Sequence, residues 1–235
     1  MKVMVIDTAL GACVAGVFAD GGVDAGAGLH VLGLRSEQMT KGHQERLGGL
    51  ARDAADEAGG FDGVDRIGVT VGPGSFTGLR VGLAFALGLG AALDRPVIGV
   101  STLDALAASV EAEGLVAAVI DARRGQVYAR LFRGGAPLGE AEAWPLETAR
   151  DRILAEAGAG TPVLVGSGAA VLYEAFPEDF TAARLSLLAA PAPEALAALT
   201  LAADPATSPP VPLYLRAPDA TPPSRLPGQP RQPAA

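Results

Sequence analysis

The pattern of apolar and polar positions predicts an α/β chain that opens with strands. Residues 2–9 and 12–19 are short runs rich in β-branched side chains, and a glycine-bearing step between them predicts a hairpin. A third strand is predicted at residues 28–34. Further along, residues 65–71 and 95–100 predict buried strands. The chain therefore begins with a sheet.

Helical periodicity separates these later strands. From His43 to Ala58 the apolar side chains recur at helical spacing between charged ones, which predicts an amphipathic helix. Residues 76–93 predict a long apolar helix, and Ser101-Thr102 is a plausible N-cap for a third helix that runs through Ala108. The predicted order is β-β-β-α-β-α-β-α.

The same pattern then begins again. VIDTALGACVAGVF (5–18) aligns without gaps with VIDARRGQVYARLF (119–132), and VTVGPG (69–74) pairs with VLVGSG (163–168) in the same order. The two matches predict two homologous lobes, residues 1–112 and a smaller 113–204. Ten prolines follow from Pro205 onward, so residues 205–235 are expected to form an extended tail, docked or loose.

Composition narrows the function classes. Lys and Arg total 18 against 26 Asp and Glu, a net charge of −8, which disfavours an autonomous nucleic-acid binder, so any RNA contact would need a partner's charge. A single cysteine and the lack of a secretory signal pattern predict a cytoplasmic location. The apolar stretch 81–93 is shorter than a bilayer requires, so no membrane span is expected.

Two aspartates are candidate nucleotide ligands. Asp7 and Asp121 each end an apolar strand before a glycine-bearing turn, where a carboxylate can hold a hydrated cation while turn amides bind phosphate. The alternative is that each aspartate only caps its own turn. If the two aspartates do bind a nucleotide, Gly166 to Gly168 are expected to lie near its adenine.

The run GPGSFTG (72–78) lies between a strand and a helix and has the look of a phosphate loop, although it fits neither standard phosphate-loop template. A tight turn that packs the helix on the sheet explains it equally well. Together with the aspartates, the candidate phosphate-loop residues are Asp7, Thr8, Gly72, Gly74, Ser75 and Asp121.

Metal and nucleophile signatures are weak. Neither His30 nor His43 stands in a zinc-ligand spacing, so no metal site is expected. Cys13 lies in an apolar strand and is expected to be a buried structural thiol, and Ser75 has no base signature nearby.

After Arg80 the helix 76–93 is apolar on every face. Such a helix must be buried all round, either beneath the second lobe or against another protein.

Several segments together resemble the TsaB family. They are the strand-end IDT, the run VGPGSFTGLRVGLAFALGLGAALDRPVIGVSTLDALA, the later DARRGQVYA, and VPLYLR. The resemblance implies a two-lobed actin/Hsp70/sugar-kinase-like (ASKHA) fold, with a mixed sheet and flanking helices in each lobe. It also implies a non-catalytic, inactive M22-peptidase-like subunit in the complex that adds a threonylcarbamoyl group to N6 of adenosine 37 in tRNAs that read ANN codons.

The same resemblance implies a catalytic paralogue, TsaD, and an ATPase, TsaE, as partners, with tRNA reached only through the complex. Where the paralogue has two metal-binding histidines, this chain has Thr102 and Leu106, so it is not expected to catalyse the transfer or to need a cofactor. Two other functions stay open. One is a small ATP-dependent kinase or phosphotransferase that uses Asp7 and Asp121, and the other is a peptidase.

The leading hypothesis is a scaffold whose first lobe presents the helices 43–58 and 76–93 to the paralogue, or to a second copy of itself when the paralogue is absent. The residues expected at this interface are His43, Leu47, Leu50, Phe76, Leu79, Arg80, Leu83 and Leu87.

Overall fold

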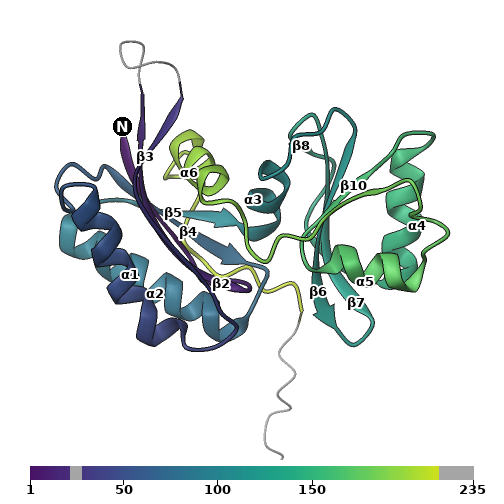
Figure 1. The fold of residues 1–235 in the computed structure, drawn as a ribbon, viewed down its shortest axis with the longest axis horizontal. Coiled ribbons are helices and arrows are strands. Elements are labelled where there is room, and N and C mark those ends of the chain that lie inside the picture. The colour runs from purple at the N-terminus through teal and green to yellow at the C-terminus, as the bar shows by residue number, and fades with distance from the viewer. Residues whose placement is uncertain (22–27, 217–235) are drawn as a thin grey trace, which may run out of the picture.

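The computed structural model describes residues 1–21 and 28–216, and they form two lobes side by side (Figure 1). The tail residues 217–235, part of the expected extension, lie outside the described residues. The first lobe contains β1 (Lys2–Asp7), β2 (Ala12–Asp20), β3 (Leu29–Gln38), α1 (His43–Glu57), β4 (Arg66–Gly72), α2 (Phe76–Leu93), β5 (Val97–Ser101) and α3 (Thr102–Ala108). The second contains β6 (Leu115–Arg123), β7 (Gln126–Arg133), β8 (Ala136–Pro137), β9 (Glu142–Pro145), α4 (Leu146–Ala157), β10 (Val163–Val165), α5 (Gly168–Ala175) and β11 (Arg184–Ser186), and α6 (Pro193–Ala202) follows.

The two sheets have matching topologies. The first has the strand order β3-β2-β1-β4-β5, in which β1 pairs antiparallel with β2 and parallel with β4. The second has the order β11-β10-β6-β7-β8, in which β6 pairs antiparallel with β7 and parallel with β10, while β9 also pairs with β7. Strands β1, β2 and β4 thus correspond to β6, β7 and β10. The duplication predicted from the sequence repeat is present in the fold, and the mixed sheets with flanking helices are those of the two-lobed actin/Hsp70/sugar-kinase-like class.

Each sheet is covered on both faces. Side chains alternate along β1, so Met4 and Ile6 pack in the core beneath α1 and α2, while Val3 and Val5 pack with Leu196 of α6 on the other face. On the second sheet α4 and α5 cover one face. Leu103 of α3 packs on the opposite face, so α3 lies between the two sheets (Figure 1).

The helix starts have the expected chemistry. Ser75 is the N-cap of α2, and its hydroxyl accepts a hydrogen bond from the Gly78 amide at 3.2 Å. Ser101 caps α3 in the same way through the Asp104 amide. The cap predicted at Ser101 is therefore confirmed. β3 differs from the prediction, because it continues to Gln38 along the whole length of β2.

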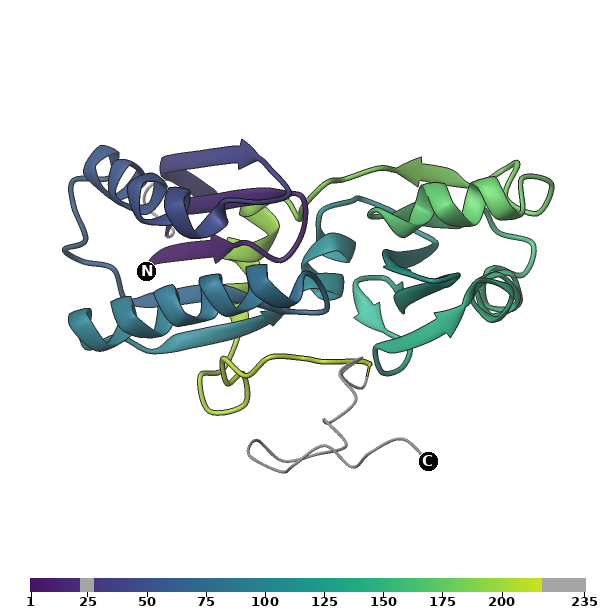
Figure 2. The ribbon, with the colours of Figure 1, turned by 90° about the horizontal axis from the view of Figure 1, so that it is seen from below.

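The chain returns to the first lobe after the second. The range 113–204 expected for the second lobe includes α6, yet this helix contacts β1, β2, β4 and β5 of the first sheet. That part of the predicted division is corrected, because the apolar face of α6 covers a sheet face that the first 112 residues leave open. Residues 204–216 then extend beneath both lobes (Figure 2).

Candidate functional site

Asp7 ends β1 as predicted, but its carboxylate is enclosed by the chain. Its side chain is 1% exposed, and Oδ1 accepts hydrogen bonds from the Ala9 amide at 2.9 Å and the Thr70 hydroxyl at 2.6 Å. Oδ2 is buried with no hydrogen-bond partner among the described residues. Burial raises the pKa of the Asp7 carboxyl, although these two hydrogen bonds lower it. A carboxylate in this setting does not fit the role of holding a hydrated cation.

The GPGSFTG loop packs on the turn that follows Asp7. The Ser75 amide donates to the Ala9 carbonyl at 2.7 Å, and the Thr8 hydroxyl donates to the Gly78 carbonyl at 2.8 Å. A Cβ at Gly74 would overlap the carbonyl oxygen of Ala9, and one at Gly78 would overlap that of Thr8. The glycines therefore allow two backbone segments to approach each other, and the loop does not fit a polyphosphate.

The second lobe repeats this arrangement in a more open form. Asp121 is partly buried, accepts from the Arg123 amide at 2.8 Å and pairs with the Arg123 guanidinium at 3.0 Å. It caps its own turn, which is the simpler of the two predicted roles. A Cβ at Gly166 would overlap the Val119 carbonyl oxygen, so this glycine also serves packing within the chain. The candidate phosphate-loop residues are thus used in the internal contacts of the two lobes.

The other candidate residues lie in the interior of the chain or do not form a site. Cys13 is a buried free thiol, and burial, with the nearby Asp7 and Glu37 carboxylates, raises the pKa of the thiol to about 11. Within residues 1–21 and 28–216, no group of three or more His, Cys, Asp and Glu side chains is placed to hold a metal ion. Thr102 and Leu106 are both fully buried.

The outer face of α2 exposes large apolar side chains. The helix packs on β4 and beside α1, and its far face is not covered by the second lobe (Figure 2). Phe76 is 53% exposed and Leu87 is 46% exposed, and Arg80 is also exposed. By length and composition α2 could cross a membrane, but core helices of soluble proteins pass the same test.

Five of the eight predicted interface residues are buried in the folded chain. His43, Leu47, Leu50, Leu79 and Leu83 are buried. The leucines face the sheet because α1 and α2 turn their most regular apolar stripes toward β1, β2 and β4. The prediction that these side chains are exposed is therefore wrong, although Leu47 lines the groove between α1 and α2. Phe76, Arg80 and Leu87 remain available.

A groove of about 690 Å³ runs between α1 and α2. Gln44 and Gly48 line it from α1, and Phe76, Ala84 and Phe85 line it from α2. We call the groove together with Phe76, Arg80 and Leu87 the docking face. Sequence reasoning missed Gln44, Ala84 and Phe85, and helical spacing from Phe76 and Arg80 was the signal that could have identified Ala84.

Tyr214 also belongs at the edge of this face. Its ring centroid lies 5.5 Å from that of Phe76, and the Arg80 guanidinium carbon lies 3.9 Å from the Phe76 centroid. The sequence places Tyr214 in a proline-rich segment remote from α2, so helical periodicity gives no signal for it.

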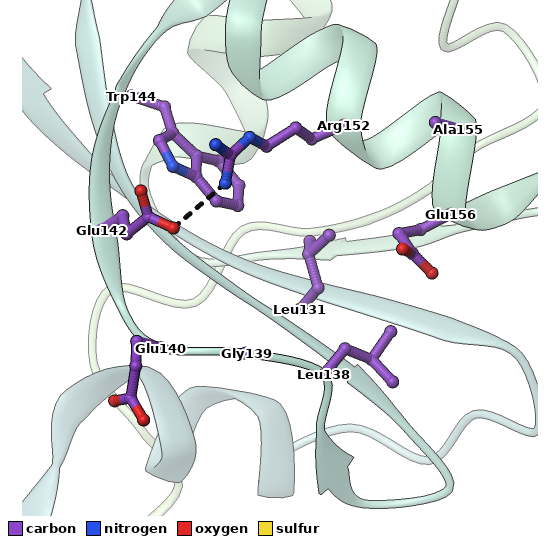
Figure 3. Close-up of a pocket in the computed structure, with 9 residues that line it drawn as sticks. All are labelled: Leu131, Leu138, Gly139, Glu140, Glu142, Trp144, Arg152, Ala155 and Glu156. Carbon is purple, nitrogen blue, oxygen red and sulfur yellow. Dashed lines mark hydrogen bonds and ion pairs between the residues drawn. The ribbon is translucent and has the colours of Figure 1, made fainter.

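The second lobe has a separate cavity of about 300 Å³ (Figure 3). Arg152 lies over the Trp144 ring at 4.7 Å and pairs with Glu142 at 3.0 Å, and Leu131 and Leu138 supply apolar walls (Figure 3). None of the predicted site residues lines this cavity.

The sequence and the fold of this chain are similar to those of known proteins. The family model described as TsaD, tRNA N6-adenosine threonylcarbamoyltransferase, matches residues 31–138. The Escherichia coli (strain K12) protein named tRNA threonylcarbamoyladenosine biosynthesis protein TsaB is 34% identical over 132 residues, which are 54% of this chain and 53% of that protein. The solved structure of YeaZ from Pseudomonas aeruginosa has a TM-score of 0.72 at 28% identity and covers 91% of this chain and 99% of that one. The chain is thus similar to a TsaB protein over about half of its length and to the YeaZ structure over most of it.

A second protein of the same name also matches. A Bacillus subtilis (strain 168) TsaB protein is 45% identical over 71 residues, which are 30% of this chain and 31% of that protein. The chain spans about half the length, or less, of the curated TsaB relatives it matches.

Proposed function

We propose that this chain is a non-catalytic scaffold subunit in the synthesis of threonylcarbamoyladenosine at position 37 of tRNAs that read ANN codons. Its partners would be a TsaD-like catalytic paralogue and a TsaE-like ATPase, in the cytoplasm, and without the paralogue it would associate with a second copy of itself. The names of the TsaB relatives and the TsaD description of the matching family model support this assignment.

The observation that carries the scaffold role is the docking face. Phe76 and Leu87 expose large apolar side chains on one helix face, beside a groove that α1 and α2 form. Contiguous exposed apolar surface of this kind marks protein–protein contact, because leaving it in water forgoes the free energy of burial. An isologous contact through the same face would give a dimer.

The burial of two residues and the hydrogen bonds of Asp7 support a non-catalytic role. Thr102 and Leu106, which stand where the resemblance places metal ligands in the paralogue, are fully buried. Asp7 is enclosed by hydrogen bonds, so no observation here favours the ATP-dependent kinase. Within residues 1–21 and 28–216, no cluster of metal-ligating side chains supports the peptidase either.

Co-purification with the TsaD-like paralogue of the same organism tests the proposal. Leu87→Asp places a charge on the docking face, and because Leu87 is exposed we expect the free energy of unfolding to change by less than about 0.5 kcal/mol while binding is lost. Leu187→Asp is the matched control, since Leu187 is 62% exposed in the second lobe. A folded Leu87→Asp chain that still binds the paralogue as the control does would overturn the scaffold role.

A further inference from the structure

A segment near the end of the chain returns to the docking face. Residues 208–216, which we call the strap, run along the first lobe, where the Leu213 amide donates to the Val71 carbonyl at 2.8 Å. A Cβ at Gly72 would lie 2.9 Å from the Leu213 carbonyl oxygen, so the strap can approach the end of β4 only because a glycine stands there. Figure 2 shows the strap crossing beneath the molecule from the first lobe to the second.

Arg216 holds the far end of the strap on the second lobe. Its guanidinium donates to the Ala122 carbonyl at 3.0 Å and to the Gln126 side-chain oxygen. These two acceptors belong to β6 and β7, which form the hairpin of the second sheet. The strap is therefore fixed on the first lobe at Leu213 and on the second lobe at Arg216, and Tyr214 lies between the two points.

Tyr214 completes a cluster on the docking face. Its side chain is 47% exposed, and its ring centroid lies 5.5 Å from that of Phe76, which is 53% exposed. The Arg80 guanidinium carbon lies 3.9 Å from the Phe76 centroid, and the Arg80 Nε lies 3.5 Å from the Tyr214 hydroxyl oxygen. We call Phe76, Arg80 and Tyr214 the composite cluster, because α2 supplies two of its side chains and the strap supplies the third.

Arg80 has a charge that no carboxylate of the described chain neutralises. Its side chain is exposed and contacts two uncharged groups, the Phe76 ring and the Tyr214 hydroxyl. It forms no ion pair within residues 1–21 and 28–216, although the chain has 26 Asp and Glu against 18 Lys and Arg. Because stacking on Phe76 restricts the guanidinium, less entropy is lost when it binds a planar acceptor. The composite cluster therefore fits a carboxylate next to apolar surface.

We propose that the strap is part of the partner-binding surface and that the composite cluster receives a carboxylate-bearing segment of the TsaD-like paralogue, an inference that rests on the proposed function. The carboxylate pairs with Arg80, and an apolar side chain of the same segment packs on the two exposed rings. Arg216 is a positioning residue, because its contacts are with the second lobe and it acts on the partner only by holding Tyr214 beside Phe76.

Isothermal titration of the full chain with the paralogue tests the role of the strap. Tyr214→Ala removes the ring that the strap supplies, and Tyr173→Ala is the matched control, because Tyr173 is 39% exposed on α5. We expect Tyr214→Ala to weaken binding by about tenfold or more, because exposed aromatic residues dominate the affinity of many interfaces. Melting temperatures report whether both variants are folded. Equal affinities of the two folded variants would overturn the proposal.

The predicted carboxylate is tested by removing the charge of Arg80. Arg80→Gln is compared with Arg95→Gln, which removes the same charge just beyond the other end of α2. We expect Arg80→Gln to lower the affinity by about tenfold and to make binding less sensitive to added salt, because salt screens a contact between opposite charges. The same affinity and the same salt dependence in both variants would contradict a carboxylate at Arg80.

Fluorine NMR tests the positioning role of Arg216. The chain has three tyrosines, so replacing them with 3-fluorotyrosine gives three resonances, and Tyr214→Phe identifies one of them. We expect Arg216→Ala to move the Tyr214 resonance toward that of free 3-fluorotyrosine and to weaken binding of the paralogue. Arg216→Lys should restore both, because an ammonium can still donate to the Ala122 carbonyl. An unchanged Tyr214 resonance in Arg216→Ala would contradict the positioning role.

Failure of this inference is distinguishable from failure of the proposed function. If the natural chain does not bind the paralogue, both are wrong. If the natural chain binds, and Leu87→Asp loses binding while Tyr214→Ala keeps it, the scaffold role stands and the strap is not part of the partner-binding surface.

Discussion

The buried carboxylate of Asp7, which has one oxygen without a hydrogen-bond partner among the described residues, makes the free energy of unfolding depend on pH. Burial raises its pKa from 3.8, so between 3.8 and the raised value the folded state binds more protons than the unfolded state. The free energy of unfolding therefore falls as pH rises through this window and levels off above it. Asp7 thus opposes folding near neutral pH while its hydrogen bonds fix the first turn.

Asp7→Asn tests this sign. The amide keeps an oxygen that can accept from Ala9 and Thr70 but has no charge to bury. Relative to the natural chain, the variant should gain stability as pH rises above 3.8, as measured by urea unfolding at each pH. A stability difference that stays constant over this range would contradict the raised pKa.

For single residues, the sequence predicts the place in a strand or helix better than it predicts what the side chain contacts. It places Asp7 at a strand end and Ser75 at a helix start, because short-range patterning determines both. It does not show whether Asp7 faces a ligand or Thr70, since that contact spans 63 positions. Helix α2 is apolar on nearly every face, so the sequence alone does not separate buried Leu83 from exposed Leu87.

At the scale of elements, the close approach of α2 to the first turn depends on glycine. A Cβ at Gly78 would overlap the Thr8 carbonyl, whereas one at Gly88 on the same helix meets no atom within 4 Å. We expect Gly78→Ala to lower the free energy of unfolding by about 2 kcal/mol, and Gly88→Ala to raise it by about 0.5 to 1 kcal/mol. Chemical denaturation measures the free energy of unfolding of both variants. Equal effects of the two substitutions would contradict the close contact between Gly78 and the Thr8 carbonyl.

Most elements of the first lobe are predictable because each has strong periodicity. The hairpin, α1, α2 and their caps follow from patterns within each segment. The extension of β3 to Gln38 is not predictable in this way, because pairing along β2 keeps its polar residues in the strand. The short strands β8 and β11 are likewise set by their neighbours.

At the scale of the molecule, the strap, residues 208–216, contacts both lobes: the Leu213 amide donates to the Val71 carbonyl, and Arg216 donates to the Ala122 carbonyl. A Cβ at Gly99 would overlap the Pro209 carbonyl, so β5 has room for the strap only because Gly99 lacks a side chain. A chain that ends at residue 207 should lose about 2 kcal/mol, or ~4–8 °C in melting temperature, through lost hydrogen bonds and ring contacts. A chain that ends at Arg216 keeps the strap and is the control. Equal melting temperatures of the two would contradict a bound strap.

The internal repeat predicts the two-lobed plan, because the matched residues carry the hairpin and the parallel strand of each sheet. The return of α6 to the first sheet is not predictable from the repeat, since the matched segments end at Gly168, before α6 begins. The strap escapes prediction for a similar reason. Proline-rich sequence excludes helix and central strand but does not say which surface the segment follows.

The amount of threonylcarbamoyladenosine in tRNA tests the central claim most directly. Cells depleted of this chain are complemented with the natural chain, Leu87→Asp or Leu187→Asp, and the nucleoside is quantified by mass spectrometry. The account predicts that the natural chain and Leu187→Asp restore the modification and that Leu87→Asp, folded and present at equal level, does not. Full restoration by Leu87→Asp, or unchanged modification after depletion, would contradict it.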